Sequence, residues 1–188
     1  MQIKGRELEF DENTHTYFVD GKKVESVTQL ISRMFPNKYA DIPKDVLKRA
    51  SERGTQVHRA IEAYCKGFDD GSNEVMDFKF LQKHYKFIPL ENELPIILDL
   101  NGKTYAGTLD LVLRIGDEFS VADIKTTSVL DKEYLVYQLN LYRIGLMQCY
   151  DYDITALYGI HINGKVRKLV KIPIIEDYRL IETMEGVL

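Results

Sequence analysis

The first part of the chain shows two kinds of apolar periodicity, one typical of strands and one typical of helices. Residues 8 to 24 alternate between apolar and polar around an Asp20-Gly21 turn, which predicts a hairpin. Ser26 directly precedes a short apolar segment that runs into Pro36. We therefore expect a helix over this segment, with Ser26 as its cap.

A longer helix is expected after Pro43, because proline is favoured in the first turn of a helix. The helical pattern continues to Gly67 and contains one weak point, Gly54. The following segment is less regular. We expect a loop at 69–73 (DDGSN) and a helix at 78–88 (FKFLQKHYKFI).

The second half of the chain is dominated by strand patterns with one long helix between them. Residues 93–100 alternate as a strand, and 107–127 form a hairpin after an NGK turn. A helix with an apolar stripe follows from about Asp131, then a hairpin around Asn163-Gly164 and a C-terminal helix. This order predicts an α/β or α+β fold, with a mixed sheet covered by helices on both faces.

Composition and charge narrow the class of protein. The chain has 188 residues, 45% of them hydrophobic and 29% charged, which predicts a single globular domain over 1–188. The formal charge of -4 argues against a protein that coats nucleic acid by bulk attraction. The first ten residues contain no apolar signal segment, and no run has membrane-spanning length, so we expect a cytoplasmic location and no membrane partner.

The hairpin at 107–127 carries charged residues where a core strand is expected. With a turn centred on residues 116 and 117, Asp110 lies opposite Asp123 and Thr108 lies opposite Lys125. Side-chain alternation then places Asp110, Asp123 and Lys125 on one face. The other face is expected to be core, formed by Leu109, Leu111, Leu113, Ala122 and Ile124.

Two opposed carboxylates destabilise a sheet unless a cation shares their site. Carboxylate oxygens suit Mg²⁺ or Mn²⁺, and a lysine beside them suits phosphodiester chemistry. The alternative is a salt bridge between Asp110 and Lys125 at a sheet edge, with Asp123 solvated. Neighbouring motifs favour the metal site.

Four short motifs stand in a characteristic order along the chain: GTQVH at 54–58, AGTLD at 106–110, DIKTT at 123–127 and QLNLY at 138–142. Together they resemble the PD-(D/E)xK phosphodiesterase superfamily, and within it the RecB-like exonuclease branch. A softer likeness to small phage and prophage members runs through YFVDGKKVESVTQLI. The resemblance implies a restriction-endonuclease-like sheet and a single nuclease domain. Its parts would be an N-terminal hairpin and helix (1–42), a nuclease core (43–172) and a C-terminal helix (173–188).

The resemblance also implies roles for individual residues. Asp110 and Asp123 would bind the catalytic metal, and the backbone carbonyl of Ile124 would complete the protein ligands. Lys125 would orient or activate the attacking water and neutralise the phosphate. His58 would approach the same metal or the phosphate from the preceding helix.

Further residues are implied less directly. Gln138 and Tyr142 share a helix face that would contact substrate and support Lys125. Glu93 stands where relatives often carry a glutamate near the metal, although a solvated strand start is an equal alternative. Glu62, one turn after His58, would either support a metal ligand or be an ordinary charge on the helix surface. The other histidines have no motif around them and are expected to be structural: His15, His84 and His161.

The expected function is a Mg²⁺- or Mn²⁺-dependent deoxyribonuclease, in particular an exonuclease without sequence specificity, acting on single- or double-stranded DNA ends in recombination, repair or replication. Two alternatives stay open: a non-catalytic nucleic-acid-binding or assembly protein that keeps the fold, and a structure-specific endonuclease. Iron–sulfur members of the branch use four cysteines, whereas this chain has only Cys65 and Cys149, so no iron–sulfur cluster is expected. Recombination or replication proteins, or further copies of the chain, are possible partners, and the location would be the host cytoplasm for a phage-encoded protein.

Basic residues gather in two places despite the negative total. One group lies on the helix that carries His58. If that helix is continuous, Lys48 and Arg59 share one side and would offer a track for phosphates, the alternative being an ordinary solvated face. The other lies on the last hairpin. The groups comprise Lys44, Lys48, Arg49, Arg53 and Arg59, and Lys165, Arg167, Lys168 and Lys171.

Overall fold

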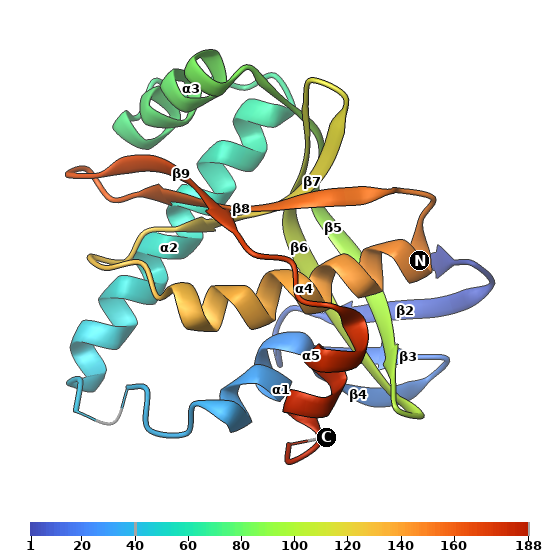
Figure 1. Cartoon of the computed structure of the whole chain (residues 1–188). Coiled ribbons are helices and arrows are strands. Elements are labelled where there is room, and N and C mark those ends of the chain that lie inside the picture. The colour runs from blue at the N-terminus through green and yellow to red at the C-terminus, as the bar shows by residue number, and fades with distance from the viewer. Residues whose placement is uncertain (40, 188) are drawn as a thin grey trace.

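The computed structural model describes residues 1–39 and 41–187, and within these the chain forms nine strands and five helices in one mixed sheet with helices on both sides (Figure 1). The strands are β1 (Gln2–Ile3), β2 (Arg6–Asp11), β3 (Thr16–Val19), β4 (Lys22–Ser26), β5 (Phe87–Leu100), β6 (Lys103–Ile115), β7 (Glu118–Lys125), β8 (Ile154–Ile162) and β9 (Arg167–Ile172). The helices are α1 (Val27–Met34), α2 (Lys44–Cys65), α3 (Asn73–Tyr85), α4 (Lys132–Cys149) and α5 (Asp177–Met184). The predicted fold class, a mixed sheet between helices, is confirmed.

The strand order is β1-β2-β3-β4-β6-β7-β8-β9, with β5 paired to β6 outside this path. Most neighbours are antiparallel, but β4 runs parallel to β6 and β7 runs parallel to β8. The chain reaches β8 from β7 through α4, since a parallel pair needs a long crossover. β6 therefore has three partner strands, and its position decides where the polar site forms.

Local signals in the sequence explain the element boundaries. The side chain of Ser26 accepts a hydrogen bond from the backbone N–H of Gln29, and Oε1 of Gln29 accepts one from the backbone N–H of Ser26, which forms a capping box at the start of α1. Asp131 caps α4 in a similar way through the N–H of Tyr134. Pro43 occupies the N-cap position of α2 rather than its first turn.

Three predicted boundaries differ from those observed. The hairpin expected at 8–24 is a three-stranded meander, because β2 already pairs with β3 before the Asp20-Gly21 turn. Helix α3 starts at Asn73 and ends at Tyr85, since Ser72 caps it and the chain then enters β5 at Phe87. The C-terminal helix is shorter than 173–188, and Leu188 lies outside the described residues.

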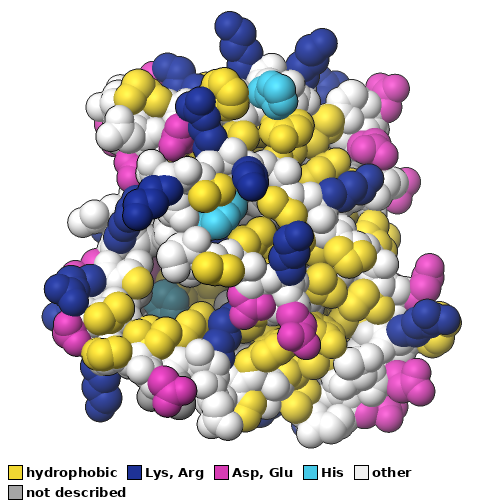
Figure 2. All heavy atoms as spheres, turned by 60° about the vertical axis from the view of Figure 1, so that its left-hand side comes forward, with side chains coloured by type: hydrophobic (Ala, Val, Ile, Leu, Met, Phe, Trp, Pro, Cys, Tyr) yellow, Lys and Arg dark blue, Asp and Glu magenta, His cyan; other side chains and the backbone are white. Residues whose placement is uncertain are grey.

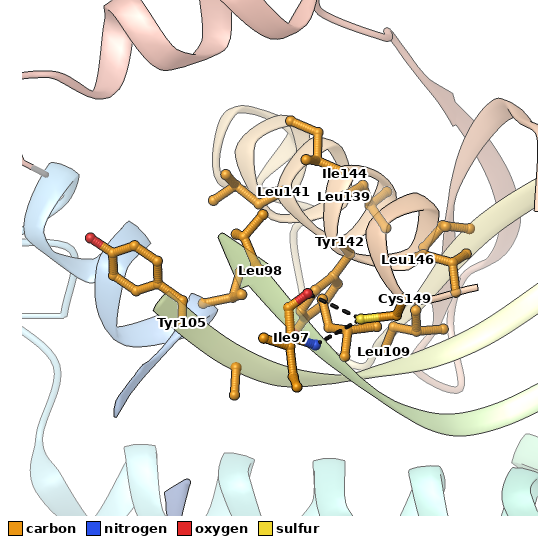
Figure 3. Close-up of a cluster of buried hydrophobic side chains, with 14 of the residues drawn as sticks. Ile97, Leu98, Tyr105, Leu109, Leu139, Leu141, Tyr142, Ile144, Leu146 and Cys149 are labelled. Carbon is orange, nitrogen blue, oxygen red and sulfur yellow. Dashed lines mark hydrogen bonds between the residues drawn. The ribbon is translucent and has the colours of Figure 1, made fainter. Parts of the chain in front are cut away.

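Two apolar clusters hold the layers together. The larger one joins α1, α4 and α5 to the sheet, and Figure 3 shows part of it, including Leu109, Tyr142 and Cys149. In the same view the Cys149 thiol bonds to the backbone of Ile97 on β5, at 3.1 Å from both the nitrogen and the oxygen. The smaller cluster joins α2 and α3 to the sheet. Cys65 and Cys149 are both free thiols.

Candidate functional site

The polar site lies where one edge of β6 changes its partner strand. Tyr105 and Ala106 pair with β4, whereas Leu111 and the residues after it pair with β7. Between them, residues 107–110 have no strand partner on that edge. A gap of this kind lets side chains and backbone groups of β6 face a cavity, as at the switch points of other open sheets.

The ladder on the opposite edge of β6 is also interrupted at this level. Asn92 pairs with Leu111 and Leu94 pairs with Leu109, but the pair between them, Glu93 and Asp110, is missing from the register. Glu93 has a left-handed backbone conformation, with φ of 47°. Non-glycine residues seldom adopt this conformation, and it often marks a functional site.

The predicted face assignment of the hairpin is wrong at one residue. Leu111, Leu113, Ala122 and Ile124 pack in the cluster under α2 and α3 as expected, but Leu109 packs in the cluster under α4. Regular alternation would place Leu109 and Leu111 on the same face. The interruption at Asp110 reverses the alternation there.

The carboxylate of Asp110 takes over a role normally filled by the sheet backbone. Its Oδ2 accepts a hydrogen bond of 2.7 Å from the backbone N–H of Ile124 on β7. The predicted register holds from Leu111–Ala122 to the turn, and it does not extend to an Asp110–Asp123 pair. The side chain of Asp110 is 12% exposed and borders the cavity.

His58 reaches the site from the middle of α2. Its Nε2 lies 2.9 Å from the carbonyl oxygen of Ile124. A carbonyl can only accept, so Nε2 carries the proton and Nδ1 faces the acids. Nδ1 lies 3.5 Å from Oδ1 of Asp110 and 3.9 Å from Oε1 of Glu93. The Ile124 carbonyl, an expected metal ligand, is thus already engaged by His58.

Three side chains converge closely enough to hold one metal ion between them. One ligand atom each from His58, Glu93 and Asp110 lies within 4.8 Å of the others. Glu93 lies inside β5, not at its start, and its carboxylate is beside His58. Asp123 stands outside this set but lines the same cavity.

Asp123, Lys125 and Gln138 form a second, deeper group. The carboxylate of Asp123 is only 2% exposed, and its Oδ2 lies 2.6 Å from Nζ of Lys125. The same ammonium donates a 3.0 Å hydrogen bond to Oε1 of Gln138 on α4. The expectation that Gln138 supports Lys125 agrees with this contact. The alternative salt bridge between Asp110 and Lys125 is replaced by the one with Asp123.

Tyr142 lies one turn further along α4, is buried, and lines the cavity. Its ring packs against Gly107 so closely that a Cβ at position 107 would lie 3.0 Å from Cε1 of Tyr142. A glycine at the partner switch of β6 thus lets α4 approach the sheet and brings Gln138 and Tyr142 to the site.

The cavity around these groups has a volume of about 290 Å³. Its outer wall is formed by the β2–β3 hairpin, through Phe10, His15 and Tyr17. The Tyr17 hydroxyl lies 3.0 Å from Oγ1 of Thr108 on β6, which ties the hairpin to the gap. Sequence reasoning missed this wall and treated His15 as structural, because the contact joins segments more than ninety residues apart.

His161 is structural in its contacts, since its Nε2 lies 2.6 Å from the Thr127 carbonyl.

Burial and mutual repulsion shift the titration of these groups. Burial, together with the charge of Asp123, raises the pKa of Asp110 to about 7. Burial also raises the pKa of Glu93. Burial acts to lower the pKa of His58 and of Lys125, but the neighbouring acids, Asp110 and Asp123 among them, outweigh it and raise both.

These residues fit a hard divalent cation. Carboxylate oxygens are the ligands that Mg²⁺ and Mn²⁺ prefer, and Nδ1 of His58 is available as a lone pair when the imidazole is neutral. Oδ2 of Asp123 is buried against the ammonium of Lys125, 2.6 Å away, and a cation in the cavity would add a second positive charge beside it. The pKa of Asp110 is raised first by burial and then by the charge of Asp123, and a cation in the cavity would counter both.

The basic residues of α2 are less available than the sequence indicates. Helix α2 is continuous, but three of its cations pair with acids: Lys48 with Glu52, Arg49 with Asp45 and Arg53 with Glu74. Arg59 borders a cavity of about 420 Å³ together with His58 and Glu93, and Glu62 pairs with Lys66. Figure 2 shows lysine and arginine side chains spread over this face, with a hollow at lower left.

Comparisons with known proteins give the fold and nothing finer. No protein-family model matches the chain, and no curated protein matches it. The chain is similar to the crystal structure of SSO0001, with a TM-score of 0.50 and 16% sequence identity over 87% of this chain and 74% of that one. Of the helices in residues 1–39 and 41–187, none combines the length and the apolarity that a bilayer crossing requires.

Proposed function

We propose that this protein is a metal-dependent nuclease that hydrolyses phosphodiester bonds of DNA, in particular as an exonuclease. The observation that carries the proposal is the convergence of an acid and imidazole set with a buried lysine in one cavity. His58, Glu93 and Asp110 offer ligand atoms on one side, and Lys125 stands on the other beside Asp123. The four motifs that resemble the RecB-like branch all reach this cavity or its walls.

The chain's own residues would divide the work between binding and charge neutralisation. His58, Glu93 and Asp110, with Asp123 behind them, would hold Mg²⁺ or Mn²⁺, which supplies Lewis acidity toward a phosphate and lowers the pKa of water. Ile124 positions two of these groups, because its N–H holds Asp110 and its carbonyl holds His58.

Lys125 is placed to bind the phosphate. An ammonium has three N–H donors, and Asp123 and Gln138 take two of them. The third donor can reach a phosphate oxygen in the cavity and offset the charge that develops during hydrolysis. Its fixed position costs no reorganisation during the reaction, which makes such a donor effective.

The test uses end-labelled single- and double-stranded DNA with Mg²⁺ or Mn²⁺. We expect the wild-type protein to release nucleotides only when metal is present, and Lys125→Ala to lower the rate by about 10²–10⁴-fold. The matched control is Lys79→Ala. Lys79 also lies 2.6 Å from an aspartate, Asp69, but on the surface of α3, so its loss should leave the rate unchanged.

Full activity of the Lys125→Ala protein would refute the proposal, and so would cleavage in EDTA. Closed circular DNA separates the two kinds of nuclease, since an exonuclease has no end to attack there. Cutting of the circle would replace the exonuclease assignment with an endonuclease. Metal binding without any cleavage would favour the non-catalytic alternative.

A further inference from the structure

A second cavity lies next to the proposed active site, between the end of α1 and the start of α4. Its volume is about 210 Å³. Aromatic rings and one cation dominate its lining, which consists of Ser32, Phe35, Pro36, Lys38, Tyr39 and Tyr134. None of these residues belongs to the metal-ligand set or to the motifs found in the sequence.

The second cavity lies one helical turn away from the candidate site along both α1 and α4. On α1, Thr28 lines the site and Ser32, one turn later, lines the second cavity. On α4, Gln138 lines the site and Tyr134, one turn earlier, lines the second cavity. One helical turn is about 5.4 Å, so the two cavities are near neighbours.

The cation in this cavity is held firmly over an aromatic ring. Nζ of Lys38 lies 3.5 Å from the ring centroid of Tyr134 and 5.4 Å from that of Tyr39. It also pairs with Asp131 at 2.8 Å. Lys38 lies closer to Tyr134 than to Tyr39, and Tyr39 is 51% exposed, so Tyr39 offers a ligand the more open ring.

We propose that this cavity binds an unpaired nucleobase of single-stranded DNA, next to the phosphodiester that Lys125 contacts. The base would stack on Tyr39, with Phe35 lining the cavity beside it, and Lys38 would donate to the base or to its phosphate. Stacking on aromatic side chains is open to every base, which suits cleavage without sequence specificity. The proposal rests on the proposed function, because it gives the nuclease a preference for single-stranded ends.

A base inside a duplex cannot offer its face to Tyr39, because the neighbouring base pairs cover both of its faces, and only the terminal pair has one open face. The cavity therefore discriminates between strands by geometry rather than by charge. Removing the ring should weaken binding of single strands and leave duplex binding nearly unchanged.

The experiment measures the dissociation constant of a short oligothymidylate in EDTA by fluorescence anisotropy, next to a blunt duplex of equal length. Tyr39→Ala should weaken single-strand binding by about 5- to 100-fold, the range found for loss of one stacking partner. Tyr39→Phe keeps the ring and should restore the affinity. Tyr178→Ala is the matched control, because Tyr178 is a similarly exposed tyrosine on α5, at 62%.

Each outcome decides one question. Equal affinity of Tyr39→Ala and Tyr178→Ala for the single strand would overturn the base site, as would an equal loss for the duplex or no binding by the wild-type protein. Cleavage with Mn²⁺ is followed in parallel. A wild-type protein that binds in the expected pattern but cleaves nothing would refute the nuclease and leave the base site standing.

Discussion

The two halves of the β6–β7 hairpin differ in how their strands pair. Near the turn, Leu111 to Ile115 pair in regular register with Ala122 to Glu118. Away from the turn this ladder stops, and Asp110 uses its side chain to accept the Ile124 N–H. The regular half packs into the core, whereas the open half borders the cavity that carries His58, Asp123 and Lys125.

The comparison teaches how a stable sheet can accommodate acids. A carboxylate buried inside a regular ladder would oppose its neighbours without compensation. In the open half, a backbone N–H and an imidazole from α2 partly compensate Asp110. On its other edge β7 pairs with β8 along both halves, from Phe119 to Lys125. Burial and the charge of Asp123 still raise the pKa of Asp110, and a bound cation would counter both effects.

The largest effect on stability is expected from Asp110→Asn in EDTA. The pKa of Asp110 in the folded protein is about 7, above its value in the unfolded chain. Folding therefore loses stability as the pH rises from about 4 to 7, and the loss persists at higher pH. The variant should be more stable than the wild type at pH 8, on the order of 4 kcal/mol, and should lack this pH dependence.

The matched control in the regular half is Asp117→Asn, at the exposed turn. Its free energy of unfolding should equal that of the wild type across the same pH range, measured by urea titration. If Asp110→Asn behaves like Asp117→Asn, the open half of the hairpin stores no electrostatic strain and the comparison between the halves fails.

An intermediate effect is expected from Glu93→Gln on metal binding. Glu93 contributes one of the three converging ligand atoms, so its loss should weaken Mn²⁺ affinity by at least about tenfold, as even outer-shell partners of metal ligands do. Isothermal titration calorimetry measures this directly. Glu118→Gln, in the regular half, should bind Mn²⁺ like the wild type. Equal affinity of the two variants would remove Glu93 from the site.

The smallest effects are expected from two glycines of β6 and its turn. In Gly107→Ala the new methyl group would lie 3.0 Å from Tyr142, so the ring must move and activity should fall a few-fold, with a loss of about 1 kcal/mol in stability. Gly116 has φ of 61° and open space around it. Gly116→Ala should cost about 1 kcal/mol of stability and leave activity intact. An unchanged rate in Gly107→Ala would show that the position of the Tyr142 ring does not affect the reaction.

Much of the fold follows from local signals, because turns and caps act within a few residues. Asp20-Gly21 and Asn163-Gly164 mark real turns, and Ser26 caps a real helix. The grouping of Asp110, Asp123 and Lys125 around one cavity also agrees with the sequence, although the side chain of Asp110, and not a strand pair at that level, joins it to β7.

The rest of the site depends on contacts that no local pattern records. The left-handed conformation of Glu93 and the missing ladder pair at Asp110 arise where β6 changes partners, and alternation alone predicts neither. His15 borders the cavity through the β2–β3 hairpin, and Lys38 covers Tyr134 across nearly a hundred residues. Such placements are fixed by tertiary packing.

The central claim is that a divalent cation balances the acids in the open half of the hairpin. A crystal grown with Mn²⁺, with data collected for anomalous scattering, tests it most directly. The account predicts a strong peak within coordination distance of His58, Glu93 and Asp110, on the side facing Asp123. Anomalous maps without a peak there, from a crystal whose acids keep the same positions, would contradict it.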